Sequence, residues 1–193
     1  MRRTVFTILL LIMMPWALPT AGAATAAGAT PGVRAAITGL PDSNLTPGAV
    51  NPNVTQVNIQ QTICVRGYTK TIRPPERYTE ALKHRQLRKY GYRDQKIWHY
   101  EEDHLVPLEV GGAPRDPRNL WPEPHYGKWG SYIKDALENE LHWRVCHGRI
   151  SLRVAQRVFE TDWVAGYRKY VVGRHYNHYW RIFSPHRHFR YWR

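Results

Sequence analysis

Residues 101–112 read EEDHLVPLEVGG, and the pair Asn119-Leu120 follows shortly after them. The surrounding segment from Lys96 to Val110 is rich in aromatic and β-branched residues, which favours a strand. The double glycine Gly111-Gly112 predicts a turn. Residues 119–121 then predict a short returning strand that two nearby prolines end. We therefore expect a two-stranded hairpin in this part of the chain.

Helices are expected on both sides of this hairpin. Thr79 can cap a helix that runs to Tyr90, with Gly91 as its stop signal. Residues 131–143 keep their apolar side chains at the spacing of one buried helical face. Ser151 can cap a final helix. The order strand, turn, strand, helix, with flanking helices, predicts a small α+β domain.

An acid directly before a histidine suits metal-assisted hydrolysis of a phosphodiester. The carboxylate of Asp103 is a hard oxygen ligand for Mg²⁺, and a neutral His104 can take a proton from the attacking water. A metal ion stabilises the charge that builds on the phosphate and the leaving oxygen. In a regular strand, however, Glu102 and His104 share a face while Asp103 points away. Without a twist or bulge, Glu102 is the better ligand candidate.

The run from Asp103 to Pro107, the Gly111-Gly112 turn and Asn119-Leu120 resemble the pattern of HNH (ββα-metal) nucleases. The resemblance implies a small ββα-metal core, flanked by helices, that holds one divalent ion. It implies that His104 is the general base, that Asp103 is a metal ligand, and that Asn119 fixes the loop and the orientation of the histidine. The expected cofactor is Mg²⁺, with Mn²⁺, Zn²⁺ or Ni²⁺ as alternatives, and the expected partner is DNA or RNA. The longer pattern also resembles small exported bacterial proteins of unassigned role.

The chain departs from the family pattern at the third ligand. The family places a His or Asn early in the helix, and the corresponding residue here is Lys128, which cannot bind a metal while protonated. A polar stripe of Asp135, Glu138, Asn139 and His142 follows at helical spacing. Asn139 or Asp135 is the expected replacement ligand. The alternative is a solvated face braced by charge pairs, which would leave the metal site incomplete.

The N-terminus has the pattern of an export signal. A positive start is followed by an apolar run over residues 5–18 and by the small residues 21–23. We expect a signal peptide over 1–23, a secreted or periplasmic protein, and no stable membrane span after cleavage; an uncleaved anchor is the alternative. Residues 24–44 are rich in Ala, Gly, Thr and Pro, which predicts a flexible linker.

Cys64 and Cys146 are the only cysteines in the chain. In an oxidising compartment an even pair predicts one disulfide. The alternative is a pair of independent buried thiols.

The formal net charge is +13, and much of the excess lies near the C-terminus. We expect an HNH-like domain over 45–166 and a basic, aromatic tail over 167–193. Basic charge attracts phosphates, and aromatic rings stack on exposed bases. An anionic envelope surface is an alternative partner, and an extension without a ligand is another. The candidate nucleic-acid-binding residues are Arg168, Lys169, Arg174 and Arg181.

Three functions are compatible with these patterns. The first is an exported, metal-dependent endonuclease of low sequence specificity, and the second is a non-catalytic HNH-like module that binds nucleic acid or other polyanions at the cell envelope. The third is an envelope-surface protein anchored by its aromatic, basic end. A ligand from Asn139 or Asp135 that faces His104 favours the enzyme. A structure without that convergence favours the binding module.

Overall fold

The computed structural model describes residues 28–174. The expected signal peptide over 1–23, and Arg181 with the rest of the tail beyond Arg174, lie outside the described residues. Within the described part, no helix has both the length and the apolar character needed to cross a membrane.

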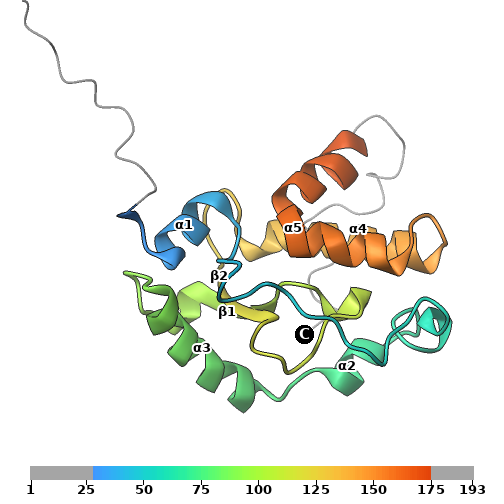
Figure 1. Ribbon diagram of the computed structural model, residues 1–193, viewed down its shortest axis with the longest axis horizontal. Helices are drawn as coiled ribbons and strands as arrows, with labels where there is room; N and C mark the ends of the chain where they lie inside the picture. Colours follow the sequence, from blue (N-terminus) through green and yellow to red (C-terminus); the bar gives the residue numbers. More distant parts are fainter. Residues whose placement is uncertain (1–27, 175–193) are drawn as a thin grey trace, which may run out of the picture.

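The centre of the fold is an antiparallel pair of strands, β1 (Tyr100–His104) and β2 (Leu120–Pro124). Helix α3 (Glu76–Tyr90) lies against one face of this sheet. Helices α4 (Ser131–Cys146) and α5 (Leu152–Tyr170) pack together on the other side (Figure 1). The prediction of a small α+β fold is therefore confirmed.

The remaining elements are short. They are α1 (Pro31–Thr38), α2 (Tyr68–Ile72) and the 3₁₀ helices η2 (Ile59–Gln61), η3 (Ile97–His99), η4 (Leu108–Val110) and η5 (Val172–Arg174). The strand expected over 96–110 is shortened to β1, with η3 before it and η4 after it. Pro122 and Pro124, predicted to end the returning strand, instead lie within β2. One backbone hydrogen bond continues beyond each end of the ladder, from the amide of His125 to His99 and from the amide of Leu105 to Asn119.

Part of the segment 24–44, predicted to be a flexible linker, is instead folded as α1 and packed on the domain. The buried Trp163 donates from Nε1 to the carbonyl of Gly39 at 2.7 Å. A Cβ atom at Gly32 would lie 2.6 Å from the ring of Tyr92. The composition argument failed here because small residues bury little surface of their own but let the backbone approach large aromatic rings closely.

Helix α5 continues to Tyr170, past the predicted domain boundary at 166. Arg168 and Lys169, predicted as part of a nucleic-acid-binding tail, lie in its last turn. The guanidinium of Arg168 lies over the ring of Trp129 at 5.1 Å. Cations are favoured at this end of a helix because its exposed carbonyls carry partial negative charge. Both residues therefore belong to the folded domain.

Cys64 and Cys146 form the predicted disulfide, with their Cα atoms 5.6 Å apart. The bond joins the loop after η2 to the last residue of α4. The loop that this disulfide closes contains a large part of the domain, because the two cysteines are 82 residues apart in sequence.

Replacing both Cys64 and Cys146 by Ser should lower the free energy of unfolding by about 2–4 kcal/mol, since the unfolded chain regains the entropy of the open loop. Urea unfolding of the oxidised wild type and of the double variant measures this difference. Wild type treated with reductant should resemble the variant. Equal unfolding midpoints for all three samples would show that the bond carries no stability.

Candidate functional site

The ladder between β1 and β2 is regular, with no bulge in its register. Asp103 pairs with Trp121 and His104 pairs with Leu120. Successive side chains of β1 therefore alternate between the two faces of the sheet. Glu102 and His104 lie on the side of α3, whereas Asp103 lies on the side of α4. The predicted base and the predicted ligand consequently project to opposite faces.

His104 is held in one tautomer by the backbone. Its Nε2 lies 3.0 Å from the carbonyl oxygen of Pro114, and because a carbonyl only accepts, Nε2 carries the proton and Nδ1 keeps its lone pair. Burial lowers the pKa of His104 to about 4. The imidazole is therefore neutral at pH 7, as a general base must be, but only 3% of the residue is exposed.

Asn119 closes the loop that contacts this histidine. Its side chain is fully buried. It accepts from the amide of Val106 at 2.9 Å and donates to the carbonyl oxygens of Val106 and Ala113. A Cβ at Gly112 would lie 1.7 Å from the Val106 oxygen, so this turn requires glycine. Asn119 thus holds in place the loop that presents the Pro114 carbonyl to His104.

On the other face, the buried side chain of Lys134 reaches from α4 to β1. Its Nζ donates to Asp103 Oδ2 at 2.5 Å, to the carbonyl oxygen of His104 at 2.9 Å, and to the Glu138 carboxylate. Burial alone would lower the pKa of Lys134, but Asp103 and Glu138 outweigh it and hold the pKa well above its ordinary value. Lys134 is therefore a permanent buried cation with a full set of acceptors.

Further carboxyl groups gather around this ammonium. Glu123 on β2 is fully buried, and neither of its oxygens has a hydrogen-bond partner among the described residues. Burial raises the pKa of Glu123 well above its ordinary value, and the charge of Asp103 raises it further, so Glu123 favours the protonated form. Burial also raises the pKa of Glu138, and it raises that of Asp135 to about 7. Protonation of several acids compensates for their excess over one lysine.

The residues expected to hold a divalent ion do not fit one. The ammonium of Lys134 fills the space between Asp103 and α4. Asn139, predicted as a ligand, is exposed and donates to the backbone carbonyl of Asp135 in its own helix. The charge of Asp103 adds to burial in raising the pKa of Asp135. The two residues belong to no group of three or more described side chains that could hold a metal ion. Asn139 lies about 100° around the helix from Glu138, so the two side chains do not point to the same place.

A different group has the closest metal-ligand spacing within residues 28–174. The ligand atoms of Cys64, His142 and Cys146 lie within 4.8 Å of one another. Both sulfur atoms belong to the disulfide, however, so they are not thiolates. His142 Nε2 lies 2.8 Å from the carbonyl oxygen of Ile63, and because a carbonyl only accepts, this nitrogen carries a proton and donates it. The oxidised protein therefore offers no metal site here.

Sequence reasoning missed Lys134, although a signal for it was present. Lys134 precedes the buried residues Leu137, Leu141 and Val145 at helical spacing and so falls on the buried face of α4. Glu138 follows it by one turn, at the spacing of an ion pair. A lysine on a buried face requires a buried acid, and Asp103 is that acid.

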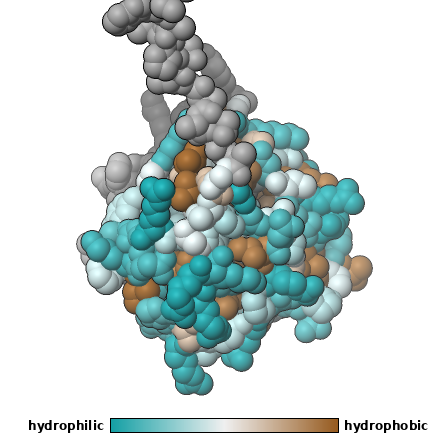
Figure 2. Space-filling model, turned by 60° about the vertical axis from the view of Figure 1, so that its left-hand side comes forward, coloured by the Kyte–Doolittle hydropathy of each residue, from teal (hydrophilic) through white to brown (hydrophobic). Residues whose placement is uncertain are grey.

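The sequence analysis also missed a basic surface on α3, because it placed most of the excess charge in the tail. The segment 66–93 contains nine Lys or Arg residues and two acids. The exposed members on α3 and the following turn, which we call the α3 basic surface, are Arg77, Arg85, Arg88, Lys89 and Arg93. None of them forms a salt bridge within the described residues. The face that carries α1 and α3 comes forward in Figure 2 and is largely hydrophilic.

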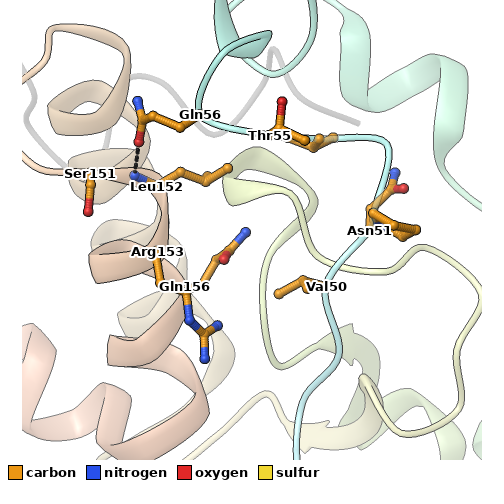
Figure 3. Close-up of a pocket in the computed structure, with 10 residues that line it drawn as sticks. Val50, Asn51, Thr55, Gln56, Ser151, Leu152, Arg153 and Gln156 are labelled. Carbon is orange, nitrogen blue, oxygen red and sulfur yellow. Dashed lines mark hydrogen bonds between the residues drawn. The ribbon is translucent and has the colours of Figure 1, made fainter.

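A pocket of about 410 Å³ lies elsewhere, between the segment after α1 and the start of α5. Figure 3 shows its side chains, with the hydrogen bond of 2.6 Å from the Leu152 amide to the side chain of Gln56. None of the residues predicted for catalysis or metal binding lines it. The lining residues are Val50, Asn51, Pro52, Val54, Thr55, Gln56, Ser151, Leu152, Arg153 and Gln156.

Comparison with protein-family models, with curated proteins and with solved structures gives no significant match for this chain. The functional inference therefore rests on the side chains described above.

Replacing Lys134 by Met should destabilise the fold by about 3–5 kcal/mol, because the buried carboxylates lose their counter-charge. Adding Asp103→Asn should recover part of this loss, since it removes one of those charges. Urea unfolding of both variants and the wild type measures the effect. A double variant no more stable than Lys134→Met would mean that the two side chains are not coupled.

Glu102 gives a prediction of pH dependence. It is buried without a hydrogen-bond partner, and burial raises its pKa from 4.5 to about 9. Between these pH values the folded state binds more protons than the unfolded state, so this residue lowers stability as the pH rises. Glu102→Gln should therefore be more stable than the wild type at pH 8, and the difference should shrink towards pH 5. The exposed Glu76→Gln serves as the control, and a gain that is equal at both pH values would contradict the assignment.

Proposed function

We propose that this protein is an exported, non-catalytic HNH-like module that binds nucleic acid or another polyanion at the cell envelope. One observation carries the proposal. The Lys134 ammonium occupies the space between β1 and α4, where the HNH resemblance implies a divalent ion. Neither Asn139 nor Asp135 completes a metal site with His104, and this favours a binding module over a nuclease.

A buried lysine cannot replace a catalytic metal ion in this position. Electrostatic stabilisation of a phosphate requires a positive group that contacts the phosphate oxygens. Lys134 is fully buried, and its hydrogen bonds are directed at Asp103, Glu138 and the His104 carbonyl. Its charge is therefore compensated within the fold, and its ammonium group does not contact a ligand at the surface.

The α3 basic surface supports the binding role. Its cations are exposed and have no acidic partner in the described residues. Lysine and arginine at such a surface release counterions from a phosphate backbone, which drives binding without regard to sequence. Lys83, in contrast, is buried on the inner side of α3 and donates to the carbonyl of Tyr100. The inner and outer charges of this helix thus have different roles.

Two observations support export. The N-terminus has the pattern of a signal peptide. The chain forms a disulfide, and disulfides persist chiefly in oxidising compartments.

Reversing two charges on α3, with Arg85→Glu and Arg88→Glu together, should weaken binding to DNA. The slope of log affinity against log salt should fall by about 2, since about one phosphate contact is lost per residue. Fluorescence anisotropy of a labelled duplex over a salt series measures this slope. The matched control is Arg149→Glu with Arg157→Glu, which makes the same charge change at exposed positions near and on α5.

The control pair should change the slope less than the α3 pair. Equal slopes for the two pairs would mean that only net charge matters and that α3 is not the contact surface. A wild type that binds neither DNA, RNA nor heparin at low salt would contradict the proposed function itself.

A metal-dependent endonuclease is the second candidate, and the state of His104 favours it. This imidazole is neutral, and its tautomer is set by the Pro114 carbonyl, as for a positioned base. If it acts in this way, His104→Ala should lower plasmid nicking by about 10²–10⁴-fold. It should leave DNA affinity nearly unchanged. Cleavage by the wild type that needs Mg²⁺, stops with EDTA and is lost in His104→Ala would establish the enzyme in place of the binding module.

A further inference from the structure

Five rings form a continuous group where the hairpin meets η3 and α4. Trp98 contacts His99, His99 contacts Tyr126, and His125 contacts both Tyr126 and Tyr132, with ring centroids 5.8 to 6.3 Å apart. The backbone joins the two sides, because the amide of His125 donates to the carbonyl of His99 at 2.9 Å. We call these five residues the aromatic platform.

The large rings of the platform are unusually exposed. Trp98 is 65% exposed, Tyr126 is 71% exposed and Tyr132 is 53% exposed. Aromatic residues stabilise a fold mainly by burying their large surfaces, so these three contribute little to the core. Contiguous exposed apolar surface on a folded protein commonly marks a site of interaction.

Polar contacts hold the platform in shape. His99 Nδ1 contacts the carboxylate of Asp94, and His125 Nδ1 lies 3.1 Å from the hydroxyl of Ser131 at the start of α4. A Cβ at Gly130 would lie 2.3 Å from the carbonyl oxygen of His125, so the loop before α4 packs closely on itself. A ligand that stacks on these rings would therefore meet a surface that is already ordered.

Positive charge borders the platform on both of its segments. Arg93 and Lys96 are exposed just before Trp98, and Lys128 is exposed just after Tyr126. Asp94, which lies between Arg93 and Lys96, is paired with His99. Arg93 also belongs to the α3 basic surface, so the rings adjoin the surface on which the proposed function depends.

We propose that the aromatic platform is a stacking site for the unpaired bases of single-stranded nucleic acid. This inference rests on the proposed function and specifies the form of the ligand. Exposed bases stack on aromatic rings whatever their sequence, and basic residues beside the rings follow the phosphates. In a duplex the faces of the bases are hidden within the stack. A neutral glycan could also stack on the rings, but it carries no charge that would interact with the basic residues beside them.

The test compares a fluorescein-labelled single-stranded dT oligonucleotide with a duplex of equal length, using the full mature chain. Trp98→Ala should lower affinity for the single strand by about 5- to 150-fold, the usual loss when one stacking ring is removed. Affinity for the duplex should stay within about twofold. Tyr126→Ala should act in the same direction. Trp143→Ala is the control, because this tryptophan stacks on His147 at the far end of α4.

The possible results distinguish a failure of the platform proposal from a failure of the proposed function. If both platform variants bind the single strand as tightly as the wild type, the platform is not the site, while the binding module stands. If they lose duplex and single-strand affinity equally, base stacking is excluded. If the wild type binds neither nucleic acid, both proposals fail. Loss of binding to a neutral chitooligosaccharide, with nucleic-acid affinity intact, would assign the platform to glycans. Circular dichroism of each variant confirms folding before binding is compared.

Discussion

The ammonium of Lys134, fully buried between β1 and α4, contacts Asp103, Glu138 and the carbonyl of His104. A buried charge is tolerated only when it is paired and hydrogen-bonded, so these three acceptors fix how far α4 is rotated about its axis relative to the sheet. That rotation places Leu137 and Leu141 in the core and leaves Asn139 outside. The disulfide then ties the far end of the same helix to the loop after η2.

The two faces of the short sheet consequently have different characters. On one face, Asp103 and Glu138 pair with the fully buried Lys134, so their charges are compensated within the fold. On the other face, burial keeps His104 neutral, and the Pro114 carbonyl sets its tautomer, beneath a loop that Asn119 closes. Both arrangements lie inside the fold. Among the described residues, the outer side of α3 and the neighbouring rings offer exposed groups to a partner.

This separation would allow a motif that resembles a nuclease site and the proposed binding role to occur in one chain. The motif residues stabilise the hairpin and its loop. The buried Asn119 side chain bonds four backbone groups, and Asp103 is paired with Lys134. The proposed recognition would rest on the α3 basic surface and on exposed rings such as Trp98 and Tyr126. Charge attracts a polyanion at long range, and the rings contribute contacts only at short range.

The sequence by itself determined the features that depend on local signals: the glycine turn of the hairpin, the start of α4 at Ser131, the Ser151 cap of α5, and the pairing of the only two cysteines. Only the tertiary structure decided the features that depend on rotation and contact between distant segments. Lys134 meets Asp103 across 31 residues, and the segment before residue 44 folds because its glycines fit against distant rings. Propensity and capping act within a few residues, whereas an ion pair between a helix and a strand depends on how the two elements are packed, which no local pattern encodes.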